Sequence, residues 1–244
     1  MKQSTGRAFV VGDIHGCAAE LERLLRRLEL EPSDRIIFLG DYIDRGADAK
    51  AVVDLLLDLR TNRRCQSTFL KGNHEDMFLD FLGFGGSHGD AFLLNGGMET
   101  LRSYGFEDPA SLSGEEEILP ANHRDFFLEL GLTFELESVL CVHAGINPKR
   151  GMNSQITEDL LWIREAFYTV PHLLERTVIF GHTPQREVHF DLPYKIGIDT
   201  GLVYGGKLSC LEITERRLFQ IGLGAETVSV SGISAFWPPD SHAF

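Results

Sequence analysis

The sequence predicts a layered α/β fold, and two observations support this prediction. Short apolar, β-rich runs alternate with helical stretches over the first 70 residues, which is typical of βαβ units. Several of these runs end directly in short motifs that combine glycine with Asp, Asn or His. Loops at strand ends are where catalytic groups collect in such folds, so a functional site is expected there.

The elements of the first part follow in order along the chain. Strands and helices alternate at Ala8–Val11, Ala18–Leu30, Arg35–Leu39, Ala49–Leu59 and Ser67–Leu70. The middle third then changes character, with a glycine-rich run at Gly83–Gly89 and an acidic helical stretch at Gly114–Leu130. We therefore expect a helical insertion at about residues 83–130, which is a candidate lid.

A second sheet is expected after the insertion. Strand-like runs with turns between them occur at Val139–Val142, Thr177–Phe180, Tyr194–Ile198, Leu208–Ile213 and Leu218–Ile221. The tail at about residues 224–244 mixes small, polar and proline residues, so we expect an irregular strap or partial disorder there. With 244 residues, 43% of them hydrophobic, the chain can bury a sizeable core, and we expect a single domain over residues 1–244.

Composition argues against several classes of protein. The net charge of -13 and the lack of a long basic stripe argue against a general nucleic-acid binder. No window of about twenty apolar residues could span a bilayer, and Met1–Gly6 is too short and polar for a secretion signal, so we expect a cytoplasmic protein that does not bind membranes. The cysteines have no CxxC spacing and are interpreted as reduced, small hydrophobic residues: Cys17, Cys65, Cys141 and Cys210.

Five short motifs carry the chemical signal. They are GDIHG at Gly12–Gly16, GDYIDRG at Gly40–Gly46, GNHE at Gly72–Glu75, HAG at His143–Gly145 and GHT at Gly181–Thr183. A lone Asp or Asn beside glycine is usually only a turn former, and an isolated histidine is usually a satisfied side chain. Five such motifs in order, each behind an apolar run, have no comparable structural explanation, and together they predict a dinuclear metal site for phosphoester hydrolysis.

The residue types in these motifs suit two transition-metal ions. Asp13 and His15 are two positions apart, so on an extended strand end they point the same way and can hold one cation. Asp41 follows another apolar strand and can bridge that cation to a second one. Oxygen and imidazole ligands in this mixture suit manganese, iron or zinc more than calcium. Three further strands contribute the other candidate ligands, Asn73, His143 and His182.

The motif set resembles that of the calcineurin-like metallophosphoesterases, and the complete GDYIDRG with GNHE resembles their phosphoprotein phosphatase branch. The resemblance covers about residues 8–213. It is closest to the short bacterial and phage serine/threonine protein phosphatases, which also carry a GHTP and a DTG followed by GG. It implies a four-layer sandwich of two mixed β-sheets flanked by α-helices, with the site at one edge.

The resemblance also divides the ligands between two metal ions. It places Asp13, His15 and Asp41 on metal one, and Asp41, Asn73, His143 and His182 on metal two. Every ligand position of the family is filled. Manganese is the expected metal, with iron and zinc as alternatives, because affinity order and availability both determine which metal is bound.

Four further residues receive catalytic roles from the resemblance. His74 resembles the family's general acid, which protonates the departing alkoxide, and Asp44 resembles its orienting carboxylate. Such a carboxylate raises the pKa of the histidine and keeps it protonated near neutral pH. Arg45 and Arg164 resemble the phosphate-binding arginines, whose planar fork fits two phosphoryl oxygens. Together with Asn73 they form the expected substrate-binding set.

We therefore expect direct attack of metal-activated hydroxide on a phosphomonoester, most simply in a serine/threonine phosphoprotein or a phosphorylated small molecule. An alternative is a symmetrical diadenosine tetraphosphatase or another nucleotide phosphoanhydride hydrolase, whose motifs are the same. Aromatic residues that could stack adenines are equally well explained by packing, namely Phe84, Phe92, Tyr104 and Tyr168. A non-catalytic scaffold of the same fold is disfavoured, because such members typically lose ligands or the acid histidine. Oligomeric state stays open.

Other polar residues receive no catalytic role. His88 is interpreted as an exposed loop histidine, and the run Glu115–Glu117 as a solvated face near a helix start. Asp199, in the DTG motif, is either a residue that supports the ligands or a turn former, and it is left out of the catalytic set.

Overall fold

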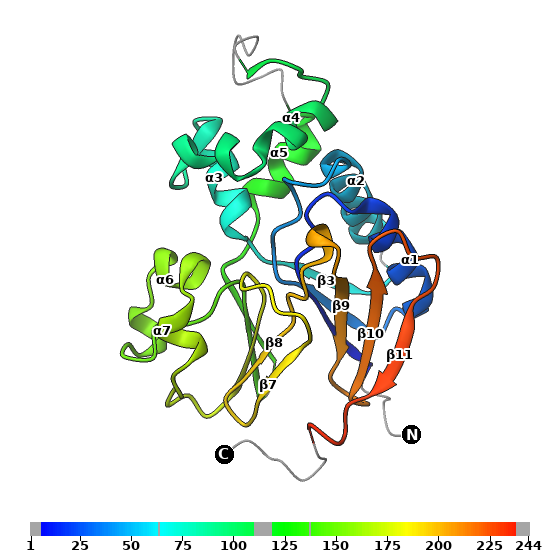
Figure 1. The fold of residues 1–244 in the computed structure, drawn as a ribbon, viewed down its shortest axis with the longest axis vertical. Helices are drawn as coiled ribbons and strands as arrows, with labels where there is room; N and C mark the ends of the chain where they lie inside the picture. The colour runs from blue at the N-terminus through cyan, green and yellow to red at the C-terminus, as the bar shows by residue number, and fades with distance from the viewer. Residues whose placement is uncertain (1–5, 63, 110–118, 137, 238–244) are drawn as a thin grey trace.

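The computed structural model describes residues 6–62, 64–109, 119–136 and 138–237. Two mixed β-sheets pack face to face, with helices on both outer sides, so the predicted four-layer α/β sandwich is confirmed (Figure 1). None of the helices in these described ranges is long and apolar enough to cross a membrane.

The first sheet has six strands in the order β11-β10-β9-β1-β2-β3. Its parallel half is built from βαβ units, in which α1 (Ala18–Leu28) and α2 (Ala49–Thr61) connect β1 (Ala8–Val11), β2 (Arg35–Phe38) and β3 (Gln66–Phe69). Its antiparallel half consists of β9 (Lys207–Glu212), β10 (Arg217–Gly222) and β11 (Ser229–Gly232). The expected strand and helix positions in the first 70 residues agree with these elements to within about two residues at each end.

The second sheet has five strands in the order β4-β5-β6-β8-β7. Its strands are β4 (Thr133–Leu136), β5 (Val139–Val142), β6 (Thr177–Phe180), β7 (His189–Asp191) and β8 (Lys195–Gly197). The helices α6 (Thr157–Trp162) and α7 (Glu165–Tyr168) cover its outer face (Figure 1). The runs at 208–213 and 218–221, expected in this second sheet, instead form β9 and β10 of the first sheet.

Alternation along the strands divides the hydrophobic side chains among three cores. In β1, Phe9 and Val11 face α1 and α2, whereas Val10 faces the other sheet. In β5, Cys141 faces the first sheet, while Leu140 and Val142 face the outer helices. Strands buried on both faces read as continuous apolar runs, which is why the sequence marks them clearly.

The edges of both sheets differ from expectation. The strands β4 and β7 were not predicted, because they are short, half-buried edge strands without a continuous apolar run. The tail from residue 224 is expected to be irregular, yet it contains the strand β11, which pairs antiparallel with β10. After β11, Ile233 and Trp237 are buried in the core between the sheets. Residues 238–244 lie outside the described ranges.

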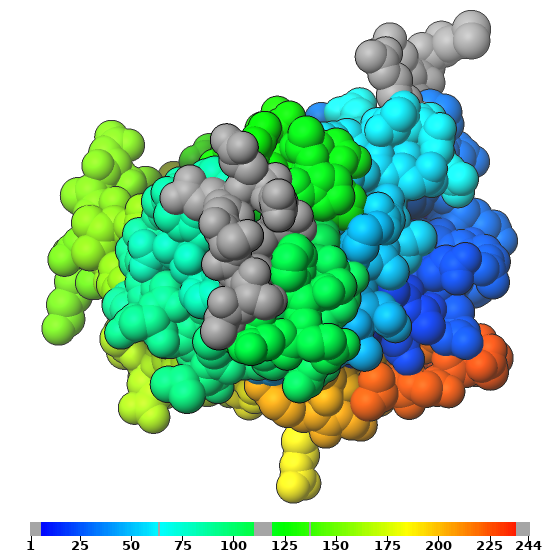
Figure 2. Space-filling model, turned by 90° about the horizontal axis from the view of Figure 1, so that it is seen from above, coloured from blue at the N-terminus to red at the C-terminus, as the bar shows by residue number. Residues whose placement is uncertain are grey.

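Helices gather at the upper end of the molecule (Figures 1 and 2). They are α3 (Asn73–Phe81), the 3-10 turns η1 (Gly89–Ala91) and η2 (Leu93–Asn95), α4 (Gly97–Ser103) and α5 (Ala121–Leu128). Phe78 of α3 connects these segments by packing, because its ring centroid lies 5.1 Å from that of Phe92 and 5.4 Å from that of Phe127 in α5. The run Glu115–Glu117 lies outside the described residues.

Candidate dinuclear metal centre

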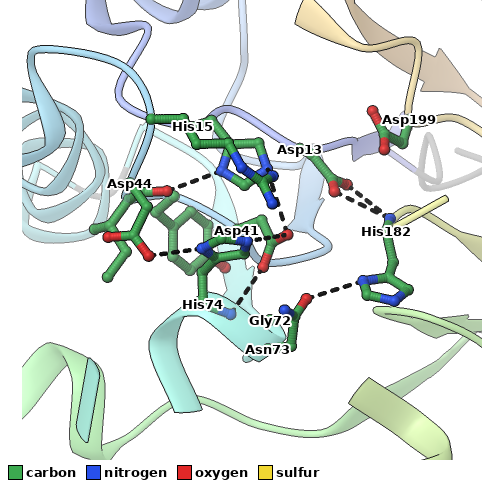
Figure 3. Close-up of polar contacts among 12 residues, drawn as sticks. Asp13, His15, Asp41, Asp44, Gly72, Asn73, His74, His182 and Asp199 are labelled. Carbon is green, nitrogen blue, oxygen red and sulfur yellow. Dashed lines mark hydrogen bonds and ion pairs between the residues drawn. The ribbon is translucent and has the colours of Figure 1, made fainter. Parts of the chain in front are cut away.

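All five motifs meet at one end of the two sheets. The loops after β1, β2 and β3 bring residues from the first sheet, and the loops after β5 and β6 bring them from the second. Every candidate ligand is buried. The five that the close-up view labels lie together (Figure 3), and His143 contacts two of them, Asp41 and Asn73. The six are Asp13, His15, Asp41, Asn73, His143 and His182.

The backbone at this end is unusually constrained. Five of the non-glycine site residues have a positive φ, a region that L-residues rarely adopt. The loops also bond to each other, since the carbonyl of Asp41 accepts the backbone N–H of Ile14 at 3.0 Å and that of His15 at 2.8 Å. Backbone strain of this kind clusters at functional sites. The five residues are His15, Asp41, Asp44, Arg45 and His182.

Glycines in two motifs make room for carboxylates. A Cβ on Gly72 would lie 2.1 Å from Oδ1 of Asp41, and a Cβ on Gly181 would lie 2.1 Å from Oδ1 of Asp13. No side chain tolerates such a contact with an oxygen held in a buried site. The glycine at each of these two strand ends therefore leaves room for a carboxylate that follows another strand.

Asp41 lies between two groups of imidazole nitrogens. Its Oδ2 is 3.5 Å from Nε2 of His15, and its Oδ1 is 3.4 Å from Nε2 of His143. Two sets of side chains have ligand atoms close enough to hold an ion, and Asp41 belongs to both of them. This is the geometry expected of a carboxylate that bridges two cations.

The tautomers of two histidines direct lone pairs into the centre. Nδ1 of His143 donates to the carbonyl of Leu39 at 3.0 Å, so in the neutral ring Nε2 carries a lone pair. That nitrogen lies 3.0 Å from Oδ1 of Asn73, which is an acceptor as well. Nδ1 of His15 likewise donates to the carbonyl of Ile43 at 2.9 Å. At His143 the lone pair faces another acceptor, and two such groups repel one another unless a cation lies between them, so this pair fits a metal.

The pKa values of the three candidate ligand histidines favour the neutral form, which is the form that can bind a metal. Burial lowers the pKa of His15 to about 3 and that of His182 to about 2, and it lowers the pKa of His143 as well. Burial also raises the pKa of Asp13, and the nearby carboxylates of Asp199 and Asp41 raise it further. Buried carboxylates at such close range require positive charge to stay ionised.

His74 differs from the other histidines. Burial alone would lower its pKa, but Asp41 and Asp44 together raise it above its ordinary value. Nδ1 of His74 donates to Oδ2 of Asp44 at 2.6 Å, and Thr100 donates to the other oxygen of that carboxylate, also at 2.6 Å. The bond to Asp44 therefore fixes the orientation of the His74 ring, and the two carboxylates favour its protonated form.

Distance alone groups His74 with His15 and Asp41, whereas Asp13 falls outside both sets. Protonation explains why His74 is better suited to carry a proton than to bind a metal, because a protonated ring has no lone pair to offer. Asp13 is held beside the centre by the backbone N–H of His182, which donates to Oδ1 at 3.2 Å and Oδ2 at 3.0 Å (Figure 3).

The two predicted phosphate-binding arginines lie differently. Nη1 of Arg45 donates to Nε2 of His15 at 2.7 Å, so its guanidinium reaches the centre directly. Arg164 is exposed at the start of α7, and no residue among those that the structure describes forms a hydrogen bond with its side chain. Burial raises the pKa of Asp199 to about 6, and the positive charges of Arg45 and Arg164 oppose this rise, which places both guanidinium groups within electrostatic reach of the site.

Two carboxylates that the sequence reasoning left without a role belong to this end. Asp199 is buried beside Asp13 (Figure 3). Glu75 is fully buried, and its two oxygens accept the backbone N–H groups of Asp41 at 2.9 Å, Gly72 at 2.8 Å and Tyr42 at 2.8 Å. Glu75 thereby joins the loops after β2 and β3. Glu75 is three positions after Gly72, the N-cap of α3, where a Glu side chain can reach back to the N-cap backbone N–H.

The remaining polar candidates lie apart from the metal ligands. His88 is half-exposed and contacts Glu158 at 3.2 Å, as expected of a loop histidine. All four cysteines are buried and free of disulfides, and burial raises the pKa of Cys141 to about 12, so no reactive thiolate is expected. The aromatic residues considered for stacking pack against the cores, namely Phe84, Phe92, Tyr104 and Tyr168.

Comparison with known proteins gives a consistent result. The model of the family described as calcineurin-like phosphoesterase matches residues 6–197. Serine/threonine-protein phosphatase 1 of Salmonella typhimurium is 29% identical over 84% of this chain and 91% of its own length. The asymmetrical bis(5'-nucleosyl)-tetraphosphatase PrpE of Bacillus mycoides is 26% identical over 94% of this chain and 96% of its own.

Solved structures share the fold. A protein provisionally assigned as a diadenosine tetraphosphatase superposes with a TM-score of 0.68 and 25% identity, over 91% of this chain and 96% of that one. A cold-active protein tyrosine phosphatase superposes with a TM-score of 0.60 at 17% identity, over 93% of this chain and 79% of that one. The second likeness is a likeness of fold alone.

Proposed function

The chain belongs to the calcineurin-like phosphoesterase family, and from this premise we propose that its buried centre holds two metal ions and hydrolyses phosphomonoesters. The observation that carries the proposal is the position of Asp41. Its two oxygens face two separate groups of imidazole nitrogens, and the histidine tautomers direct lone pairs toward it. A single-ion site would not need a carboxylate shared in this way.

The ligands divide between the two ions as the family pattern implies. Asp13, His15 and Asp41 would hold one ion, and Asp41 would share the other with Asn73, His143 and His182. Manganese is our choice for assays, with iron and zinc as alternatives. When bound, such a pair of cations polarises a phosphoryl oxygen and lowers the pKa of water.

The chain's own residues supply positioning and proton transfer. His74 carries a proton on Nε2, while Asp44 holds Nδ1 and thereby fixes the direction in which Nε2 points. We assign His74 as the general acid that protonates the leaving oxygen. Arg45 and Arg164, with the amide of Asn73, would bind the phosphoryl oxygens, where negative charge develops in the transition state.

For the substrate, we propose a serine or threonine phosphoprotein. The likeness to serine/threonine-protein phosphatase 1 of Salmonella typhimurium supports this choice, because that relative is similar over most of both chains. A second candidate is hydrolysis of a dinucleoside tetraphosphate, which the likeness to PrpE and to the solved structure supports. That relative is named as asymmetrical, whereas the alternative raised from the motifs is a symmetrical diadenosine tetraphosphatase or another nucleotide phosphoanhydride hydrolase.

A scaffold without activity is the least supported reading. Such a role would not require every ligand, the acid histidine and its carboxylate to be present together and buried.

The test compares two substrates on the same protein. Metal-stripped protein is assayed with and without added manganese, on a phosphoserine peptide and on diadenosine tetraphosphate. Manganese-dependent dephosphorylation of the peptide supports the protein phosphatase proposal, whereas a preference for the dinucleotide favours the second candidate. Failure to hydrolyse either substrate with any transition metal would overturn both.

Matched histidine variants test the assignment of the ligands. His143→Gln should lower the bound metal to about one ion per chain and lower turnover strongly. His172→Gln is the control, because His172 is equally buried but bonds to the carbonyl of Tyr194 at 2.7 Å, away from the centre. Equal metal loss in both variants would indicate a general effect of disturbing a buried histidine.

A further inference from the structure

Tyr204 is an aromatic side chain at the mouth of the centre that the proposed mechanism does not use. It belongs to η5 (Leu202–Tyr204), which follows the DTG motif. Its neighbour Leu202 is buried, but Tyr204 is 62% exposed. Large aromatic residues usually bury their rings, so an exposed one beside a candidate active site suggests a binding role.

The ring of Tyr204 contacts an arginine of the centre. The guanidinium carbon of Arg45 lies 5.4 Å from the ring centroid, within the range of a cation–π contact. The same guanidinium donates to Nε2 of His15 at 2.7 Å. Tyr204, Arg45 and His15 therefore form a continuous line from solvent into the buried ligands.

The loop that carries Tyr204 is held in one conformation. Gly201 and Gly205 both have positive φ values, of 67° and 88°, and the backbone N–H of Tyr204 donates to the carbonyl of Gly201 at 3.0 Å. Asp199 accepts the N–H of Gly201 at 2.9 Å, which links this turn to the buried carboxylates. Tyr204 is thus an exposed ring on a fixed turn, as pre-organised binding requires.

We propose that Tyr204 is a specificity-determining residue, whose exposed ring stacks against a planar ring carried next to the phosphoryl group of the substrate. This inference rests on the proposed function, in which Arg45 binds phosphoryl oxygens, because Tyr204 contacts the same guanidinium and therefore lies next to the phosphoryl group that it would bind. Of the two substrates proposed above, this inference favours the second, a dinucleoside tetraphosphate with its heteroaromatic bases, over the serine or threonine phosphoprotein. A phosphotyrosyl side chain is the other ring-bearing phosphate that the test includes. An aliphatic phosphothreonyl side chain offers no such ring.

The experiment uses two peptides of the same sequence, one with phosphotyrosine and one with phosphothreonine, together with diadenosine tetraphosphate. The kcat/KM of each substrate is measured with manganese for wild type, Tyr204→Phe, Tyr204→Leu and Tyr204→Ala. Phe236→Ala is the control, because Phe236 is also 62% exposed but stacks on Phe190 of β7, away from the centre. Dividing the kcat/KM of each variant by the wild-type kcat/KM on the same substrate removes the intrinsic difference in reactivity between the leaving groups.

Loss of the ring should lower kcat/KM on a ring-bearing substrate about threefold to tenfold more than on the phosphothreonyl peptide. Tyr204→Phe should keep the wild-type ratio between the peptides, since it keeps the ring. A larger loss on the dinucleotide identifies a nucleotide as the ring-bearing substrate, and a larger loss on the phosphotyrosyl peptide identifies an aryl ester.

An equal loss on all three substrates would overturn the inference and leave Tyr204 as a support for Arg45, with the proposed function intact. If wild type hydrolyses none of the three substrates, the proposed function fails, and this inference fails with it. Tyr204→Leu keeps an apolar side chain on the turn, so a result shared by the leucine and alanine variants does not reflect misfolding of the loop.

Discussion

Replacing Asp44 with Asn tests the proton-transfer part of the account. The carboxylate accepts Nδ1–H of His74 at 2.6 Å in a fully buried position, and the bond is charge-assisted. Such a bond is worth about 1.5 to 3 kcal/mol, and losing the charge of the carboxylate should lower the pKa of the histidine. Asparagine can still accept the bond, so the change removes the charge and keeps the geometry.

In Asp44→Asn the pKa of His74 falls, so the ring loses its proton at a lower pH. Activity that depends on the protonated ring is present below that pKa and lost above it, and the alkaline limb of the kcat profile should therefore move to lower pH. At neutral pH we expect kcat to fall about tenfold to a hundredfold on an alkyl phosphoester. The assay is a pH–rate profile with manganese-loaded protein, together with metal analysis of each sample.

Leaving-group dependence supplies the internal control for this variant. A substrate with an acidic phenol as leaving group needs little protonation, so the same variant should lose much less activity on it. Thr100→Val is the matched structural control, since Thr100 bonds to the same carboxylate without touching His74. A loss of equal size on both leaving groups, or an alkaline limb that does not move, would refute the assignment of His74 as general acid.

Three further predictions follow from single contacts. Gly181→Ala puts a Cβ 2.1 Å from Oδ1 of Asp13, so metal analysis should find less than two ions per chain, and wild-type content would refute the reasoning. Lys195 is buried and donates to three carbonyls at and after the end of α7, at 2.6 to 3.3 Å. Urea unfolding of Lys195→Met should therefore show a loss of about 2 to 3 kcal/mol in the free energy of unfolding, against little change for the half-exposed control Lys207→Met. Burial alone would raise the pKa of Asp34, but Arg7 lowers that pKa overall. The ion pair therefore contributes stability above the pKa of Asp34 in the unfolded chain, and this stability is lost as pH falls through the pKa of Asp34 in the folded protein. Asp34→Asn should therefore flatten the decline of melting temperature below about pH 4, and an unchanged acid profile would contradict this.

The central strands and the buried candidate ligands could be predicted from the sequence for one physical reason. Strands buried on both faces must be apolar throughout, and polar residues can follow them only where the strand ends. Because the carboxyl ends of parallel strands meet at one edge of a sheet, motifs far apart in the sequence, such as those at Asp13 and Asp41, were expected to meet. In the structure, His15 of the first motif lies 3.5 Å from Asp41 of the second.

Other features depend on tertiary context that a single sequence does not display. The edge strands β4, β7 and β11 are short and partly exposed, so no continuous apolar run identifies them. Which sheet β9 and β10 join is decided by the register of β9 beside β1, not by their composition. Glu75 and Tyr204 were missed because a carboxylate that binds backbone amides and an exposed ring beside an arginine have local sequences like those of ordinary surface residues.

The most direct test of the central claim is a titration of metal-stripped protein with manganese, in which bound metal per chain and phosphoester hydrolysis are measured on the same samples. The account predicts two ions bound per chain, with hydrolysis reaching its maximum only when both are present. Hydrolysis at full rate without metal, or full activity with one ion bound, would contradict a dinuclear centre bridged by Asp41.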